Sequence, residues 1–250
     1  MPPPLTVLTW NIGRLHLGRH VNRVFRFDSR AHDKALHHVA RVIDESEAHV
    51  VVLQELASRD QLQQILGLLG DGWDGGMGPD AGGDRAVALL MQRRYAGRHL
   101  QHETVPLEGG RNAEICRGEG WITIGLHFDA FRAKVRHRQI QGLAAFVDSL
   151  VEETVIVAGD LNIDMRYPLH SRASDKVFLR AMTTTFTDLG LRKGPTAAGR
   201  RRLDYILVRG AASAEARVMR RRRVPLGDHD PLLARVVLPE ARAQEARQAR

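Results

Sequence analysis

The sequence has a single cysteine, Cys116, among 250 residues, and aromatic residues make up only 5% of the chain. One thiol cannot form an internal disulfide, so the sequence excludes a small disulfide-stabilised scaffold and suits a reducing compartment. No apolar run approaches the roughly 18 residues that a transmembrane segment needs. Met1–Pro4 leads directly into an apolar run, with neither the basic nor the apolar region of a secretory signal peptide. These absences predict a cytoplasmic protein.

Lysine is also scarce, with four lysines against 33 arginines, and the net charge is +8. Most of the excess lies in residues 192–223, which contain eleven basic residues and two acids. Such a concentration of charge is expected where a polyanion binds, and a solvated arginine-rich surface is the plain alternative. The candidate polyanion contacts in this segment are Arg202, Arg220, Arg221, Arg222 and Arg223.

Hydrophobic residues make up 43% of the chain, enough for a sizeable core. Apolar runs rich in β-branched residues predict strands at 5–10, 49–53, 86–91, 121–126, 154–158, 204–208 and 232–238. Helical spacing of apolar residues predicts helices near 35–43, 62–69 and 143–150. The continuous apolar strands favour sheets covered by helices on one face and by a second sheet on the other. The glycine-rich stretch 70–83 is predicted to be a loop, 1–239 a single domain and 240–250 a polar tail.

Polar side chains stand at the ends of these predicted strands. They are Asn11, Glu55, His127, Asp160, Asn162, Asp204, Asp228 and His229. Each alone has an ordinary explanation, such as a turn or a helix cap. Together they can converge on one rim of a sheet, where carboxylate and amide oxygens suit Mg²⁺ or Mn²⁺ and a histidine can transfer a proton. The set indicates phosphate-ester hydrolysis, which needs charge neutralisation, an oriented water and leaving-group protonation.

Five segments resemble, in order, the motifs of the endonuclease/exonuclease/phosphatase superfamily. They are Leu8-Thr9-Trp10-Asn11-Ile12, Val52-Leu53-Gln54-Glu55, Gly159-Asp160-Leu161-Asn162, Arg202-Leu203-Asp204-Tyr205-Ile206-Leu207 and Gly227-Asp228-His229-Asp230-Pro231. The resemblance spans residues 8 to 231. It implies a four-layered α/β sandwich of the deoxyribonuclease I type, in which two packed mixed β-sheets are flanked by helices.

The resemblance implies a role for each residue that matches a motif. Glu55 would be the principal metal ligand, Asn11 would also contact the metal, and Asp228 would lie close to it. Asp160 and Asn162 would position the attacking water and contact the phosphate.

Two histidines enter the same comparison. His229 would be a catalytic histidine oriented by Asp204. His127 matches a second family histidine, Asp84 resembles the acid that orients it, and Arg111 matches a phosphate-contacting arginine. The sequence departs from the family before His127, because Gly125-Leu126 stands where Asn-Thr is usual.

The combined prediction is a monomeric Mg²⁺-dependent phosphodiesterase, with Mn²⁺ as a substitute, that hydrolyses nucleic acid. One alternative keeps the chemistry and changes the substrate to a phosphoinositide or sphingomyelin headgroup, which a long apolar membrane-binding loop would favour. The sequence has no such loop. Another alternative is a nucleic-acid-binding module with weak catalysis, which the intact set of predicted catalytic residues disfavours.

Overall fold

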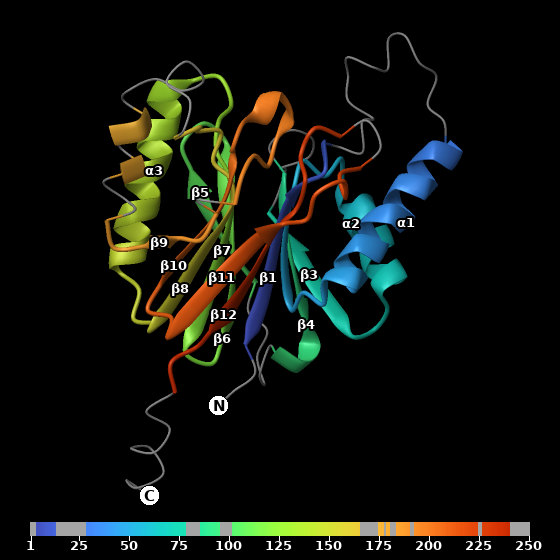
Figure 1. Ribbon diagram of the computed structural model, residues 1–250, viewed down its shortest axis with the longest axis horizontal. Helices are drawn as coiled ribbons and strands as arrows, with labels where there is room; N and C mark the ends of the chain where they lie inside the picture. Colours follow the sequence, from blue (N-terminus) through green and yellow to red (C-terminus); the bar gives the residue numbers. More distant parts are fainter. Residues whose placement is uncertain are drawn as a thin grey trace, which may run out of the picture.

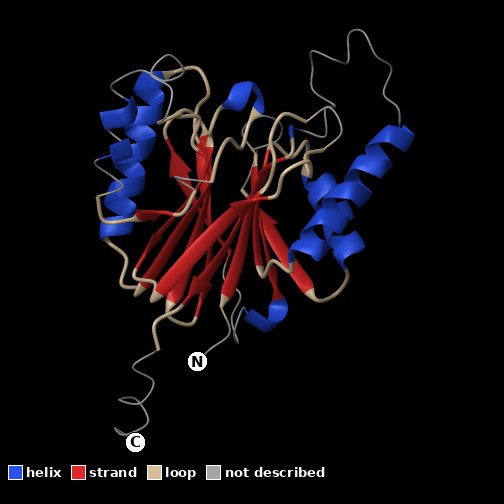
Figure 2. Ribbon diagram, viewed as in Figure 1, coloured by secondary structure: helices blue, strands red, loops and turns tan. Residues whose placement is uncertain are grey.

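The computed structural model describes residues 4–13, 29–78, 86–95, 102–165, 175–177, 179–180, 184–190, 193–224 and 227–240. Two six-stranded sheets pack face to face, and helices cover the outer face of each sheet (Figure 2). This arrangement confirms the predicted four-layered α/β sandwich. Within the described ranges, no helix is long and apolar enough to cross a bilayer. Asp84 and the predicted tail beyond Glu240 lie outside the described residues.

The first sheet has the strand order β11-β12-β1-β2-β4-β3. Its strands are β1 (Leu5–Asn11), β2 (Val50–Gln54), β3 (Trp73–Met77), β4 (Val87–Gln92), β11 (Ser213–Val218) and β12 (Leu232–Val237). Helices α1 (Ser29–Ser46) and α2 (Arg59–Leu69) pack on its outer face. Because β1 and β2 are parallel and β12 is antiparallel to β1, the end of β1, the end of β2 and the start of β12 share one edge.

The second sheet has the order β5-β6-β7-β8-β10-β9, and helix α3 (Ala133–Asp148) covers its outer face (Figure 1). Its strands are β5 (His102–Leu107), β6 (Arg111–Gly118), β7 (Trp121–His127), β8 (Thr154–Asp160), β9 (Thr187–Asp188) and β10 (Asp204–Arg209). In the β-sheet register, Asp160 is paired with His127 of β7 on one side and with Asp204 of β10 on the other. Three predicted site residues therefore lie in one row across neighbouring strands.

The alternation of side chains turns this row inward. Along β8, Ile156 and Ala158 pack between the two sheets, whereas Val155 and Val157 pack in the layer that contains α3. Asp160 continues the first series, because residues two apart on a strand face the same side. The row at the strand ends consequently faces the opposite sheet and lies at the edge of the inter-sheet core.

Several strands at or next to the sheet edges were not predicted from the sequence. The expectation of a loop at 70–83 is wrong for Trp73–Met77, which forms β3 by pairing with β4. Strands β5, β6 and β11 likewise had no predicted counterpart. The side chains of β3, β5 and β11 are largely half-buried or exposed, so these strands lack the apolar runs of the central strands.

The departure from the family before His127 has a packing explanation. A Cβ atom on Gly125 would lie 2.8 Å from Val52 Cγ1 of the facing sheet. Leu126 packs on the other side of β7, in the core beneath α3. Glycine at this position thus allows β7 and β2 to approach each other just below the predicted site.

Gly159 should be essential to the fold. Its φ is +153°, and a Cβ atom would lie 2.0 Å from the backbone oxygen of Leu126. We expect Gly159→Ala to lower the free energy of unfolding by about 2–5 kcal/mol, from backbone strain and overpacking. Gly67→Ala in α2 is the control, because nothing lies within 4 Å of its Cβ position and helix propensity should raise stability by up to about 1 kcal/mol. Urea unfolding measures the stability of both variants, and equal midpoints for Gly159→Ala and Gly67→Ala would contradict the expectation.

Candidate active site

Six polar side chains from both sheets meet at one end of the sandwich, which lies at the top of Figure 1. The first sheet contributes residues at the end of β1, just after β2 and shortly before β12, and the second sheet contributes the row on β7, β8 and β10. All but Glu55 are at least 95% buried. The six are Asn11, Glu55, His127, Asp160, Asp204 and His229.

Asn11 joins the carboxylates of the two sheets. Its Nδ2 donates to Asp160 Oδ2 at 3.0 Å and to Glu55 Oε1 at 3.1 Å, while its Oδ1 accepts the N–H of Gly13 at 3.0 Å. In this orientation the amide nitrogen, and not the oxygen, faces the carboxylates. The structure thus brings Asn11 and Glu55 together, with Asn11 acting as a hydrogen-bond donor to Glu55 and Asp160, and a contact of Asn11 or Glu55 with a metal stays a prediction.

Two residues of the site adopt left-handed backbone conformations. Glu55 has φ +61° and Asn162 has φ +52°, values that are uncommon for residues other than glycine and that are often retained at functional sites. The N–H of Glu55 bonds the oxygen of Ala86 on the neighbouring chain segment. Asn162 donates its N–H to Asp160 Oδ1 at 2.8 Å and its side-chain amide to the oxygen of Phe128 at 3.1 Å. The turn at Glu55 thus fixes the Glu55 carboxylate, and the turn at Asn162 fixes the carboxylate of Asp160.

His229 and Asp204 form the tightest ionisable pair of the site. His229 Nδ1 lies 2.8 Å from Asp204 Oδ2, and its Nε2 lies 3.8 Å from Asp160 Oδ2. Burial alone would lower the pKa of His229, but Asp204 and then Asp160 outweigh it and raise the pKa to about 10. Burial, with Asp204 adding to it, raises the pKa of Asp160 above its usual range. Asp204 thus lies where it can orient His229, and the catalytic role of His229 stays a prediction.

Asp228 lies at the edge of the cluster, and its side chain is 51% exposed. Its Oδ1 is 3.8 Å from His229 Nε2, and its Oδ2 is 4.0 Å from Arg201 Nη2. The structure therefore places Asp228 beside the histidine and an arginine. A direct role at a metal remains a prediction.

The second histidine, His127, faces the same carboxylates from β7. Its Nε2 lies 3.7 Å from Asp160 Oδ2 and 3.9 Å from Glu55 Oε1. Arg111 Nη1 lies 3.0 Å from His127 Nδ1, and the side chain of Arg111 is buried. The structure thus brings Arg111 against the second histidine. Its predicted phosphate contact stays a prediction.

The predicted arginine contacts do not all lie on the surface. Arg202 is completely buried, forms an ion pair with Asp188 and stacks over the Tyr205 ring at 4.1 Å. The prediction that Arg202 binds substrate is wrong for this geometry, because an enclosed guanidinium has no surface to offer.

The run from Arg220 to Arg223 divides into two pairs. Arg222 forms an ion pair with Glu45 at 2.8 Å, and Arg223 forms one with Asp230 at 2.9 Å. Arg220 is exposed and donates to the oxygen of Lys193, and Arg221 is exposed as well. Only Arg220 and Arg221 of this run therefore keep their charge away from a carboxylate of the chain, among the residues that the structure describes.

Thr196 is a residue of the site that the sequence did not reveal. Its Oγ1 accepts the backbone N–H of Leu203 at 3.2 Å and of Asp204 at 3.1 Å, and its carbonyl accepts the N–H of Asp230 at 2.7 Å. Thr196 is buried, and its bonds hold the segment that carries Asp204 to the segment that carries His229. A single threonine before a basic turn carries no recognisable signal in a sequence.

The donor set suits a hard divalent cation. Ligand atoms of Asp160, Asp204 and His229 lie within 4.8 Å of one another; the two acids offer carboxylate oxygens, whereas His229 is protonated and pairs with Asp204. Asp204 Oδ1 is buried without a hydrogen-bond partner, and Glu55 adds a third carboxylate next to Asp160. A buried group of carboxylates is costly unless positive charge compensates it, and oxygen-rich sets are what Mg²⁺ and Mn²⁺ prefer.

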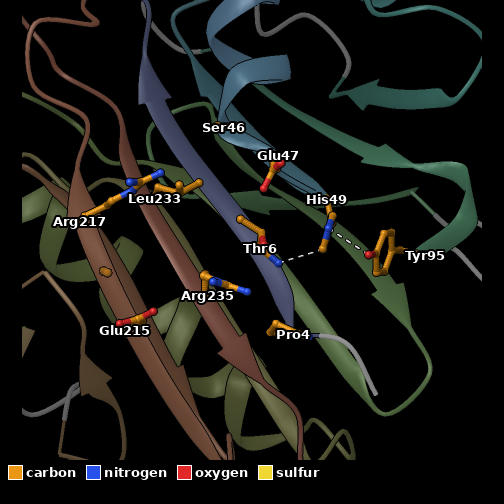
Figure 3. Close-up of a pocket in the computed structure, with 11 residues that line it drawn as sticks. Pro4, Thr6, Ser46, Glu47, His49, Tyr95, Glu215, Arg217, Leu233 and Arg235 are labelled. Carbon is orange, nitrogen blue, oxygen red and sulfur yellow. Dashed lines mark hydrogen bonds between the residues drawn. The ribbon is translucent and has the colours of Figure 1, made fainter. Parts of the chain in front are cut away.

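A pocket of about 420 Å³ lies on the outer face of the first sheet, beside the end of α1 (Figure 3). There His49 Nδ1 accepts the N–H of Thr6 at 3.0 Å, and the Tyr95 hydroxyl lies 2.9 Å from His49 Nε2. Burial, then Arg94 and Arg235, lower the pKa of His49 to about 4, so this imidazole is neutral. The rim of the pocket mixes acidic and basic side chains without a carboxylate cluster, so the pocket does not resemble the candidate active site.

Comparisons with known proteins agree with the fold and the motifs. The sequence profile of the endonuclease/exonuclease/phosphatase family matches residues 8–229. Truncated TDP2 from Caenorhabditis elegans is similar in structure, with a TM-score of 0.69, 18% identity, and coverage of 94% of this chain and 97% of that one. An endonuclease/exonuclease/phosphatase from Bacteroides vulgatus is similar as well, with a TM-score of 0.68 and 15% identity. The match covers 94% of this chain and 99% of that one. Among curated protein sequences, none matches this chain.

Thr196 should be necessary for the stability of the site. Thr196→Val keeps the shape but leaves two buried N–H groups without an acceptor, which should cost about 2–5 kcal/mol of unfolding free energy. Thr196→Ser keeps the hydroxyl and should retain most of the stability. Denaturant unfolding measures the loss, and the downfield proton signal of the His229 Nδ1–H reports the bond to Asp204. A valine variant with unaltered stability and signal would contradict the role.

Proposed function

The chain belongs to the endonuclease/exonuclease/phosphatase family, whose members hydrolyse phosphoester bonds, and from this premise we propose that it is a Mg²⁺-dependent phosphodiesterase acting on nucleic acid. The observation that carries the proposal is the meeting of three carboxylates, two histidines and an amide within contact distance at one end of the sandwich. This arrangement contains the groups that phosphodiester hydrolysis requires.

Glu55 and Asp160 would hold the cation, with Asn11 fixing both carboxylates. When bound, a divalent cation would neutralise charge on the phosphoryl oxygens. Asp160, held by Asn11 and by the N–H of Asn162, would accept a hydrogen bond from the attacking water and orient it. Asn162 would act chiefly by fixing Asp160, since its side chain is bonded to the oxygen of Phe128.

The two histidines would act on the phosphate from different strands. His229 is kept protonated by Asp204, so its Nε2–H can donate to the leaving oxygen or to a charged phosphoryl oxygen. His127, on the other side of Asp160, would contact a second phosphoryl oxygen, supported by Arg111. The site would thus stabilise charge with groups whose positions are fixed before substrate binds.

Cationic side chains near the site favour a polyanionic substrate. Arg220 is exposed and donates to the backbone oxygen of Lys193, and the half-buried Arg201 lies 4.0 Å from the carboxylate of Asp228 beside His229. Such side chains can neutralise phosphates that flank the scissile bond. This cationic edge supports nucleic acid over an isolated headgroup.

Removal of one acidic charge tests the cation site. Glu55→Gln should weaken Mn²⁺ or Mg²⁺ binding and lower hydrolysis by more than about 100-fold, because even hydrogen-bond partners of metal ligands cost 10–100-fold. Glu47→Gln is the matched control, since Glu47 also has a positive φ but lies at the far pocket. Calorimetry measures binding, and EDTA should abolish the wild-type activity. Full activity of the Glu55→Gln protein in EDTA would contradict metal dependence.

A salt series tests the polyanion proposal. Each arginine that contacts a DNA phosphate adds about 0.9 to the slope of log affinity against log salt. Arg220→Gln with Arg221→Gln should therefore flatten the slope by up to about 1.8 on duplex DNA, measured with an Asp160→Asn protein. Arg222→Gln with Arg223→Gln should change it less, because Glu45 and Asp230 already pair these arginines. Equal slopes in both double variants, with hydrolysis of phosphoinositide or sphingomyelin but not DNA or RNA, would overturn the nucleic-acid assignment.

A further inference from the structure

The loop that follows β7 is tied directly to the candidate active site. The N–H of Phe128 donates to the backbone oxygen of Asp160 at 2.9 Å, and the Asn162 side chain donates to the oxygen of Phe128 at 3.1 Å. The loop therefore begins in contact with the two residues proposed to position the attacking water. Its next four residues are fixed relative to that point.

Asp129 organises the rest of this loop. Its Oδ1 accepts the backbone N–H groups of Phe131 at 2.9 Å and Arg132 at 2.7 Å, and its Oδ2 accepts two bonds from the Arg132 guanidinium. Gln139 and Arg136 of α3 bond the backbone N–H and oxygen of Asp129. Although burial works in the opposite direction, these bonds to Arg132 and Phe131 lower the pKa of Asp129 to about 2. The carboxylate thus keeps the loop in one conformation at neutral pH.

This fixed loop holds an aromatic ring in solvent. Phe131 is 89% exposed, and it is the only aromatic residue among the large apolar side chains that are exposed in the described part of the chain. Phe131 is four residue steps from His127, with three residues between them, so their Cα atoms lie at most about 14 Å apart. That reach corresponds to about four nucleotides at a rise of 3.4 Å. The ring is consequently within reach of a base up to about four nucleotides from a phosphodiester held at the site.

We propose that Phe131 forms a nucleobase-stacking subsite, on which an unpaired base of the substrate lies while a phosphodiester within about four nucleotides of that base occupies the active site. The inference rests on the proposed function and specifies its substrate as a single strand or an unpaired end. Base stacking on an aromatic face tolerates any base, because every base offers a π-face. The neighbouring Arg132 is 55% exposed at its side chain, but Asp129 pairs its charge, so it contributes chiefly by holding the loop that carries the ring.

The same ring suits a membrane less well. Stable membrane attachment requires several apolar groups or more than one anchoring signal. Ala130 and Arg132, the sequence neighbours of Phe131, add no bulky apolar surface. A single exposed ring on this loop therefore suits a nucleobase better than a membrane surface.

Binding of a single-stranded oligonucleotide that contains 2-aminopurine tests the subsite in the Asp160→Asn background. Stacking on Phe131 should quench the fluorescence of 2-aminopurine, and Phe131→Ala should relieve the quenching and raise Kd about 5- to 150-fold. Phe131→Leu keeps the apolar bulk and should behave like alanine, whereas Phe131→Trp should restore binding. Val151→Ala is the control, because Val151 is 94% exposed but precedes β8 at the opposite end of the sandwich.

The outcomes separate this inference from the function on which it rests. In the active enzyme, Phe131→Ala should lower the ratio of kcat/KM on an oligonucleotide to kcat/KM on a small chromogenic diester. Hydrolysis of oligonucleotides with equal Kd for wild type, alanine and leucine variants would overturn the subsite and leave the phosphodiesterase intact. A leucine variant that retains wild-type affinity would also overturn stacking, and loss of binding to anionic vesicles alone would assign the ring to a membrane. A wild-type protein that neither binds nor cleaves any nucleic acid would overturn both proposals.

Discussion

The buried carboxylate of Asp160 is the point on which the site depends. It belongs to the second sheet, but it accepts a hydrogen bond from Asn11 of the first, and both histidines lie within 4 Å of its Oδ2. A buried carboxylate is costly without such partners. Its neighbours in the register are His127 and Asp204. A slip of one residue in β8 would turn the carboxylate toward α3 and separate it from the other site residues. The pairing of three strands thus determines the chemistry.

The sequence predicted the centre of the fold better than its edges. Central strands such as β2 and β8 are buried on both faces and appear as continuous apolar runs, so their ends, and the polar residues there, could be located. Strand β3 has two glycines and mostly half-buried side chains, and β11 alternates charged and small residues at an exposed edge. Their strand conformation depends on pairing with β4 and β12, which a local pattern does not encode.

The composition of the site was predictable, but the direction of its side chains was not. The motifs identified Asn11, yet which amide atom faces the carboxylates depends on the N–H of Gly13. Arg202 stands in a basic run, and the count of charges cannot show that Asp188 and Tyr205 enclose it. Thr196 acts through bonds to segments before and after it in the sequence, so its role is visible only once the chain is folded.

The ion pair between Arg223 and Asp230 shows why the basic segment cannot be interpreted as one surface. Asp230 follows His229 directly, and it bonds Arg223 through its carboxylate and Thr196 through its backbone N–H. Trp10 donates its indole N–H to the oxygen of His229 from the other side. Arg223 therefore helps to anchor the segment that carries the histidine, whereas Arg220 and Arg221 remain exposed to a ligand. The anchoring charges are thus paired within the chain, and the basic segment combines a structural part, which holds the segment of His229, with an exposed part, which does not.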